Sequence, residues 1–282
     1  MITVFGSINV DIVTRVAKTP QPGETVHGSD YQLFAGGKGA NQALAARRAG
    51  AAVRLVGTIG DDDIGKVALT ELDPAGVDLA AVGRRAGTTG VAIITVDEAG
   101  ENTIVVSPGA NAATTADQVP DGAFDAGDTL LLQMEVPYAE NMKVARLAAD
   151  AGARVVLSVA PFSPLTVPEL GPTTVVVVNE HEAADFARHL GLSARGEQAV
   201  VTALARRLDR TVIATLGPEG AVAHGPEGLV RVPALPVTPV DTTGAGDTFA
   251  GVLAAWLDEG ASLRDAMARA AIAGSLACTR EG

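Results

Sequence analysis

A segment near the C-terminal end of the chain combines glycines with a carboxylate. Residues 241–249 read DTTGAGDTF and open a predicted helix over residues 245–257. Small residues let backbone N–H groups approach an anion closely, and a helix N-terminus adds about half a positive charge. The turn from Gly244 to Gly246 could therefore bind a phosphate, with Asp247 in the first turn of the helix. A glycine-rich helix start, stabilised by an Asp in its first turn, explains the same pattern equally well.

A second glycine-rich segment, residues 34–42, reads FAGGKGANQ and leads into an alanine-rich helix predicted over residues 39–49. Its backbone N–H groups, together with Lys38 and Asn41, could contact a polyhydroxyl ligand or a phosphate. The alternative is a flexible loop that enters a helix. Three glycines and a lysine side by side favour the ligand interpretation.

A third segment imitates a phosphate-binding loop without its chemistry. Residues 60–67 read GDDDIGKV, which satisfies the spacing GxxxxGK. Val67 has no hydroxyl for magnesium, and three carboxylates would face the phosphates, so we reject a P-loop here. Neither glycine-rich segment matches the GxGxxG dinucleotide fingerprint, and the chain has no GxSxG elbow. The motifs of nicotinamide-dependent oxidoreductases and of serine hydrolases are therefore missing.

Polar side chains follow the ends of several predicted strands. They are Asn9 and Asp11 after residues 2–5, Glu135 after residues 129–132, and Asn179 and Glu182 after residues 175–178. The carboxyl ends of parallel strands meet at one edge, where open α/β sheets bind ligands, so we expect these side chains to line one cleft. Because Mg²⁺ prefers oxygen ligands and keeps several waters, the last two could organise a hydrated magnesium ion. An Asn cap with an acidic first turn is the alternative.

The elements that would position these residues alternate between strand and helix. Short β-branched runs predict strands over residues 2–5, 53–56, 129–132, 154–157, 175–178 and 211–216, and a hairpin over 221–223 and 229–232. Longer alanine- and leucine-rich runs predict helices over residues 39–49, 138–151, 180–189, 245–257 and 263–277. This alternation predicts an α/β fold, in which helices flank a right-handed parallel sheet.

Two stretches, about residues 12–35 and 88–107, interrupt the alternation. Within the second, residues 91–96 and 103–106 flank a polar turn that contains Gly100, which predicts a β-hairpin. Inserted strands beside an α/β body often form a lid. Without an internal repeat or a flexible linker, we expect residues 1–282 to form a single domain with a small β-strand lid.

Composition narrows the function classes. The 282 residues carry a net charge of −12, which argues against nucleic acid or an anionic membrane as a partner. One cysteine, Cys278, excludes an internal disulfide and a multi-thiolate metal site. The N-terminal residues lack a basic leader, and no apolar run approaches the ~20 residues of a membrane span. We expect a soluble, cytoplasmic protein.

Taken in order, these segments resemble the ribokinase family of carbohydrate kinases, also called the PfkB family, over essentially the whole chain. The matching segments are residues 6–11, 22–25, 36–42, 60–62 and 133–135, Asn179 with Glu182, 215–217 and 241–249. The resemblance implies the fold of that family, and within the family it is strongest to the ribose-phosphorylating members.

The resemblance also implies roles for individual residues. Those expected to hold a sugar are Asn9, Asp11, Gly37, Lys38, Asn41 and Glu135. Asp247 would take the proton from the attacking hydroxyl, and Gly244, Ala245 and Gly246 would form the anion hole. Those expected at the nucleotide are Asn179, Thr215, Gly217, Gly220 and Gly246. Glu182 would act on Mg²⁺ through water, and Asp241 with Thr243 would contribute to a monovalent-cation site for K⁺.

The implied activity is ATP-dependent phosphorylation of the primary hydroxyl of a small sugar, with D-ribose converted to ribose 5-phosphate. Deoxyribose, fructose or a ribonucleoside are alternative acceptors. A catalytically silent sugar-binding protein is a further alternative, although pure binding would not require Asp247 beside an anion hole. Family lids also mediate dimerisation, so we expect a homodimer that forms through the lid.

Overall fold

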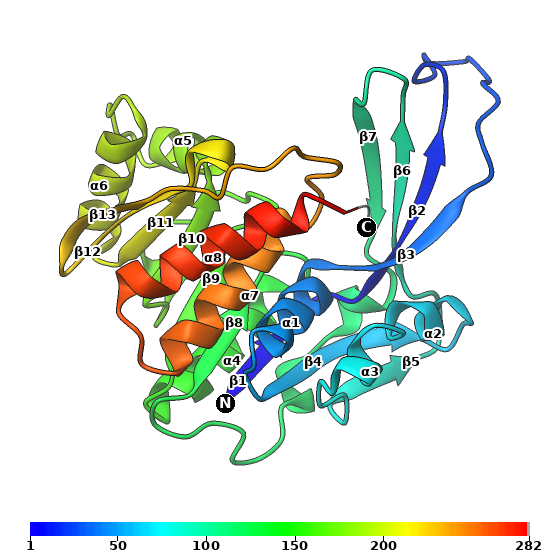
Figure 1. Cartoon of the computed structure of the whole chain (residues 1–282). Coiled ribbons are helices and arrows are strands. Elements are labelled where there is room, and N and C mark those ends of the chain that lie inside the picture. The colour runs from blue at the N-terminus through cyan, green and yellow to red at the C-terminus, as the bar shows by residue number, and fades with distance from the viewer. Residues whose placement is uncertain (281–282) are drawn as a thin grey trace.

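The larger of two β-sheets contains nine strands within residues 1–280, the part of the chain that the computed structural model describes (Figure 1). Its strands follow the order β13-β12-β11-β10-β9-β8-β1-β4-β5. Their bounds are β1 (Ile2–Phe5), β4 (Val53–Gly60), β5 (Val82–Arg85), β8 (Thr129–Leu132), β9 (Arg154–Ser158), β10 (Val175–Asn179), β11 (Thr211–Thr215), β12 (Ala221–Gly225) and β13 (Gly228–Val232). All pairs are parallel except for the hairpin at one edge, where β12 pairs antiparallel with β11 and β13. The predicted sheet and hairpin are confirmed.

The central strands of the large sheet are apolar on both faces. Val175 and Val177 of β10 face one hydrophobic cluster, whereas Val176 and Val178 face the other. Such continuous Val-rich runs are typical of parallel strands that are buried on both sides. Each face therefore needs a layer of helices.

Three long helices cover each face. On the near face in Figure 1 lie α1 (Lys38–Arg48), α7 (Ala245–Asp258) and α8 (Leu263–Ala277). On the opposite face lie α4 (Tyr138–Asp150), α5 (Glu180–His189) and α6 (Glu197–Leu208). Two short helices, α2 (Ile64–Ala68) and α3 (Leu72–Ala75), complete the list of α-helices within the described residues. No helix of residues 1–280 is long and apolar enough to span a membrane.

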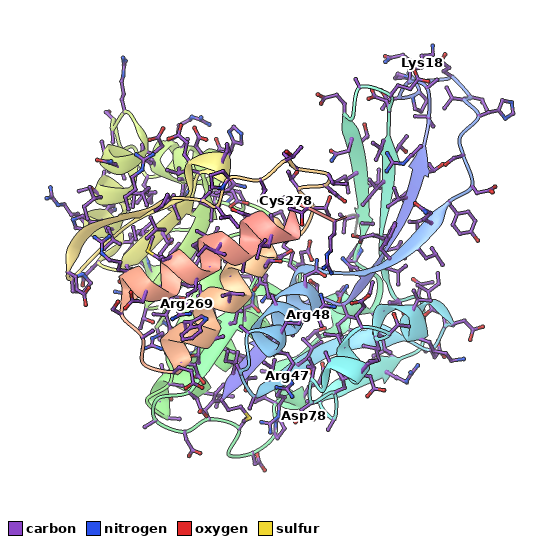
Figure 2. The ribbon with its side chains drawn as sticks, viewed as in Figure 1. Lys18, Arg47, Arg48, Asp78, Arg269 and Cys278 are labelled. Carbon is purple, nitrogen blue, oxygen red and sulfur yellow. The ribbon has the colours of Figure 1, made fainter. Side chains whose placement is uncertain are left out.

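A second sheet of four strands, called the small sheet below, projects from this body (Figure 1). It has the order β3-β2-β6-β7, with β2 (Asn9–Arg15), β3 (Gln32–Gly36), β6 (Gly90–Val96) and β7 (Asn102–Ser107). The predicted β6–β7 hairpin is confirmed. Lys18 lies at the free tip of the small sheet, whereas Cys278 lies at the end of α8, on the side of the body that faces it (Figure 2).

The first strand of the small sheet, β2, follows β1 after residues 6–8 and contains Asn9 and Asp11. The Asp-rich segment that imitates a P-loop holds the end of the small sheet that joins the body. Asp62 Oδ2 accepts the Thr89 backbone N–H at 2.8 Å, and Asp62 Oδ1 accepts the Thr89 hydroxyl at 2.6 Å, just before β6. That carboxylate is thus a structural anchor and not a phosphate ligand.

The helices α1 and α7 cross at very short range. A Cβ atom on Gly251 would lie 2.4 Å from the Gln42 carbonyl oxygen and 2.8 Å from Ala45 Cβ. Only glycine leaves enough space for this contact, because real Cβ atoms do not approach other atoms so closely. The N-terminal turns of the two helices are consequently held side by side.

Candidate functional site

Asp247 lies in the first turn of α7 and is the centre of the site. Its side chain is only 8% exposed. Gln42 Nε2 donates a hydrogen bond to Asp247 Oδ1 at 2.8 Å, and Asn41 Nδ2 approaches Asp247 Oδ2 at 3.5 Å. Burial raises the pKa of Asp247, Lys38 and the two amides lower it, and the net shift is upward. Because the hydrogen bond to Oδ2 is much longer than the one to Oδ1, Oδ2 is the oxygen better placed to accept a proton.

The turn before Asp247 can receive an anion. Gly244 has φ 71°, a left-handed conformation that starts α7. Apart from Gly246, its two chain neighbours and the nearby backbone of α7, no atom lies within 4 Å of the position that a Cβ on Gly246 would occupy, so a ligand could approach the backbone there. The first N–H groups of a helix have no acceptor within it and carry part of the helix dipole. This geometry fits the predicted anion hole at Gly244, Ala245 and Gly246.

The start of α1 packs closely against the backbone that follows β1. Gly37 has φ 92°, and a Cβ on it would lie 2.6 Å from the Asn9 backbone nitrogen. Glu135 accepts two hydrogen bonds at one oxygen, from Ser7 Oγ at 2.6 Å and from the Lys38 backbone N–H at 3.1 Å. The helix start, β1 and the segment after β8 are therefore joined through one carboxylate.

Asn9 is held by a residue that the sequence did not indicate. Asn111 Nδ2 donates to Asn9 Oδ1 at 2.6 Å, and Asn111 Oδ1 accepts the Ile8 backbone N–H at 2.9 Å. A Cβ on Gly90 would lie 2.2 Å from both side chains, so this position also requires glycine. The fixed carbonyl leaves the amide NH₂ of Asn9 to donate toward a ligand.

Four carboxylates surround the Lys38 ammonium. Burial acts to lower the pKa of Lys38, but the charges of Asp247, Glu135, Glu182 and Asp11 outweigh it, and the net shift is upward. Burial raises the pKa of Asp11 from its ordinary value of 3.8 to about 6, and the neighbouring Glu135 and Asp247 add to the shift. The cluster holds more negative charge than its single lysine can neutralise, which suits polyhydroxyl groups or a cation.

The predicted nucleotide residues lie at the ends of neighbouring strands. Thr215 lies opposite Asn179 in the parallel register of β10 and β11. Gly217 has open space where a Cβ would point, so a ligand could approach it. Gly220 differs, because a Cβ there would lie 2.1 Å from the Val232 carbonyl oxygen. The close packing against β13 is the role of Gly220 that the structure shows.

Asn179 and Glu182 form the capping box that the sequence left as the alternative. The Asn179 backbone N–H donates to Glu182 Oε2 at 2.7 Å, and the Glu182 backbone N–H donates to Asn179 Oδ1 at 2.8 Å. Glu182 also interacts electrostatically with Lys38 and Asp247, and burial is the largest cause of its raised pKa. Glu182 can therefore cap α5 and still lie beside the carboxylate cluster.

Asp241 and Thr243 form a separate turn before the anion hole. Asp241 Oδ1 accepts the Thr243 backbone N–H at 2.8 Å, and the Cys278 carbonyl oxygen accepts the N–H groups of Val240 and Asp241 at 2.7 and 3.2 Å. This turn is therefore fastened to the end of α8. No group of three His, Cys, Asp or Glu side chains in residues 1–280 is arranged to hold a metal ion.

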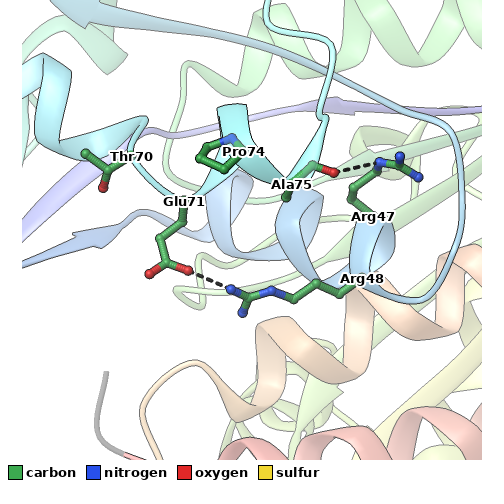
Figure 3. A pocket seen from close by; sticks show the side chains of 6 residues that line it. All are labelled: Arg47, Arg48, Thr70, Glu71, Pro74 and Ala75. Carbon is green, nitrogen blue, oxygen red and sulfur yellow. Dashed lines mark hydrogen bonds and ion pairs between the residues drawn. The ribbon is translucent and has the colours of Figure 1, made fainter.

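A cavity of about 470 Å³ lies away from these residues, at the other end of α1 (Figure 3). Its two arginines are already engaged: Arg47 donates to the Ala75 carbonyl oxygen at 3.0 Å, and Arg48 pairs with Glu71 at 2.6 Å. It contains none of the predicted site residues.

Sequence reasoning missed several residues that support the site. They are Ser7, Gln42, Asn111 and Gln133. Ser7, Gln42 and Gln133 stand inside the segments that carried the family resemblance, so adjacency to those motifs was a usable signal. Asn111 lies far from them in the sequence, in a turn after β7, and nothing local marks it.

We predict that Asp11→Asn stabilises the protein more at pH 8 than at pH 5. Because the folded state raises the pKa of Asp11 to about 6, it binds the proton more tightly than the unfolded state does. Stability is therefore lost as the pH rises from about 4 to about 6, and the penalty persists above that range. Removing the charge should recover on the order of 1 to 3 kcal/mol at pH 8. Urea denaturation at both pH values measures it.

Asp30→Asn, at an exposed position before β3, is the matched control. It should change the free energy of unfolding by less than about 0.5 kcal/mol at either pH. An Asp11→Asn protein that gains no more at pH 8 than at pH 5 would contradict the assignment of the buried charge.

The matching family model, the similar curated proteins and the similar solved structures agree with one another. Residues 1–282 match the family model described as pfkB family carbohydrate kinase. The Bacillus subtilis ribokinase is 37% identical over 282 residues, which cover 98% of this chain and 92% of the relative. A crystal structure of ribokinase from Thermotoga maritima superposes with a TM-score of 0.90 at 31% identity, over 100% of this chain and 93% of that chain. The Arabidopsis thaliana ribokinase complexed with ribose and ATP has a TM-score of 0.87 at 30% identity, with 100% and 93% covered. The chain belongs to the pfkB family of carbohydrate kinases.

Proposed function

We propose that this protein is an ATP-dependent ribose kinase that transfers the γ-phosphoryl group of ATP to the 5-hydroxyl of D-ribose. The observation that carries the proposal is the buried Asp247 in the first turn of α7, whose Oδ2 oxygen has only a long hydrogen bond of 3.5 Å, from Asn41 Nδ2. Full-length similarity to curated ribokinases supports ribose as the acceptor. The single cysteine, Cys278, and ATP as co-substrate fit a cytoplasmic enzyme, which cell fractionation would test.

In this reaction Asp247 accepts the proton of the attacking hydroxyl. The hydroxyl oxygen forms a bond to the γ-phosphorus while the bond from that phosphorus to the ADP oxygen breaks, and the N–H groups of the Gly244 to Gly246 turn stabilise the charge on the phosphoryl group. Phosphoryl transfer requires mainly positioning and charge stabilisation, so a carboxylate suffices as the base.

The sugar would bind where β1, β2 and the start of α1 meet. The groups that would hold its hydroxyls are the backbone at Gly37 and the side chains of Asn9, Asp11, Lys38, Asn41 and Glu135. Carboxylates accept hydroxyl hydrogens and amides donate to hydroxyl oxygens, which suits a polyol. ATP would extend from the anion hole over Asn179, Thr215 and Gly217.

The residues present fit a hydrated Mg²⁺ ion and a monovalent cation. Glu182 uses only Oε2 in its capping box, and its Oε1 makes no hydrogen bond within the described residues. This oxygen would hold a water of Mg²⁺, which when bound neutralises phosphate charge. The oxygens of Asp241 and Thr243 would contribute to a K⁺ site, because K⁺ takes oxygen ligands and these lie next to the anion hole.

The base assignment predicts that Asp247→Asn lowers kcat by at least about 100-fold, because an amide cannot accept the proton. ADP formation from Mg-ATP with D-ribose measures kcat, and calorimetry should show that D-ribose still binds within a few-fold of the unmutated affinity. Asp265→Asn, in the exposed first turn of α8, is the control and should keep full activity. A fully active Asp247→Asn protein would disprove the mechanism.

The cation assignments predict that a chelator in excess stops ADP formation. Glu182→Gln should raise the Mg²⁺ concentration needed for half-maximal activity about tenfold, whereas Glu180→Gln, which is exposed in the same helical turn, should not. Replacing K⁺ by tetramethylammonium should lower kcat, and Asp241→Asn should remove that dependence. Equal Mg²⁺ requirements in both Glu variants would refute the Glu182 role.

We further propose that the small sheet is a lid that closes over the sugar and joins two copies of the chain. One face carries Asp11 and turns toward the site, whereas the other carries an apolar row across all four strands. Leu33 is 40% exposed, Ile93 48% and Val105 61%, with Ile12 between the first two in register. Contiguous exposed apolar side chains on a protrusion mark an interaction surface, and a second copy would cover them.

Ile93→Glu should therefore convert a dimer into a monomer, because it places a charge in the centre of the apolar row. Sedimentation velocity at micromolar concentration measures the mass. Leu229→Glu, at a 44% exposed apolar position on β13, provides the control and should leave the dimer intact. A protein that is monomeric before mutation would rule out the proposed interface.

A further inference from the structure

A row of buried amides leads from Asp247 into the protein, and the mechanism above gives it no role. Gln42 Nε2 donates to Asp247 Oδ1 at 2.8 Å, and Gln133 Nε2 donates to Gln42 Oε1 at 2.8 Å. Both glutamines are completely buried. The Gln133 backbone carbonyl, directly after β8, accepts from Asn141 Nδ2 of α4 at 2.6 Å. The row therefore connects the carboxylate to the sheet and to a helix on its opposite face.

The chemistry of the carboxylate fixes the orientation of both glutamine amides in the row. An ionised carboxylate can only accept, so Gln42 must turn its NH₂ group toward Asp247 and its carbonyl oxygen toward Gln133. That oxygen can only accept, so Gln133 must in turn present its NH₂ group. Reversing either amide would place two acceptors against each other.

This orientation leaves an uncompensated polar atom at the far end. Gln133 Oε1 is buried and has no hydrogen-bond partner, which is destabilising. The same oxygen occupies the space that a side chain on Gly6 would need, since a Cβ there would lie 1.8 Å from it. An apolar residue at this position would instead leave the buried Gln42 Oε1 without a donor. The unsatisfied oxygen of Gln133 therefore accompanies a donor that holds Gln42, the residue that donates to Asp247.

We propose that Gln42 and Gln133 are positioning residues that hold Oδ1 of Asp247 and thereby present Oδ2 to the hydroxyl that is phosphorylated. This inference rests on the proposed kinase function and adds two residues to it. Gln133 makes no hydrogen bond to Asp247 and acts only by fixing the amide of Gln42.

The row also favours the ionised form of the base. A hydrogen bond to a carboxylate stabilises its charged form, and the bond from Gln42 opposes the effect of burial on the pKa of Asp247. The charged side chains that face Asp247 from other elements are Lys38, Glu135, Asp11 and Glu182. None of them contacts Gln133 through a hydrogen bond, so a change at Gln133 leaves their charges in place.

Gln133→Met tests the inference, because it removes the donor but keeps the length of the side chain. The acidic limb of the kcat–pH profile should move up by about one pH unit, so that kcat at pH values below the midpoint of the limb should fall about tenfold. The KM for D-ribose should change less than about twofold, because the sugar contacts remain. An unmoved acidic limb would overturn the proposal, as would a loss expressed only in KM.

Thr129→Val is the matched control. Thr129 is fully buried at the start of β8, and its hydroxyl oxygen also has no partner, but it belongs to no chain of bonds that reaches the site. Its pH profile should equal that of the unmutated protein. An equal shift in both variants would show that general damage to β8 causes it and would overturn the proposal.

A measurement on the unmutated protein does not depend on whether a variant folds. The side-chain amide resonances of Gln42, assigned through bonds from its own backbone resonances, should titrate with the midpoint of the acidic limb. Ribose-dependent ADP formation without such a titration would overturn this inference and leave the kinase function standing. No ADP formation from any sugar would instead overturn the proposed function, and this inference with it.

Discussion

The close crossing of α1 and α7 is the constraint on which the site depends. Gly251 follows Asp247 by one helical turn, and the missing side chain lets the α1 backbone approach at Gln42 and Ala46. Two helices that come from opposite ends of the sequence thereby place an amide, a lysine and a carboxylate within hydrogen-bond or Coulomb range. A larger residue at Gly251 would separate the carboxylate from the amide that orients it, without touching a substrate.

Charge explains why the proposed anion binding would rely on backbone groups. The chain has a net charge of −12, and its site gathers Asp11, Glu135, Glu182 and Asp247 around Lys38. Those carboxylates suit a neutral polyol but would repel the phosphates of ATP. The helix N-terminus and bound cations supply attraction without adding further lysines to the site. The proposed sugar-binding side, which is acidic, and the proposed anion-binding side meet at Asp247, where transfer would occur.

Much of the fold could be predicted because the core strands are apolar runs bounded by glycines and polar residues. The helices over Glu180–His189 and Leu263–Ala277 match their predicted bounds, since both have clear caps. The α6 helix was missed, because its N-cap residue is Gly196, which provides no side-chain cap. The edge strand β5 was also missed, because it contains two exposed arginines and no apolar run.

The site was predictable only in part. Glycine-rich segments and polar strand ends indicated the residues that are proposed to face a ligand, whereas the residues behind them depend on tertiary contacts. Asn111 reaches Asn9 across about a hundred residues, and Gln133 reaches Gln42 across a similar span. No local pattern encodes such pairs. The lid predicted from the sequence starts at residue 12, whereas the small sheet starts at Asn9, because β2 pairs with Gly36 and Gly90 from its first residue.

The central claim is transfer to a primary hydroxyl, and phosphorus NMR of a reaction with Mg-ATP and D-ribose tests it most directly. One new phosphomonoester per ADP, with its phosphorus coupled to the two C5 protons, is the predicted result. ADP accompanied by inorganic phosphate, or a phosphate on the anomeric oxygen, would contradict the account.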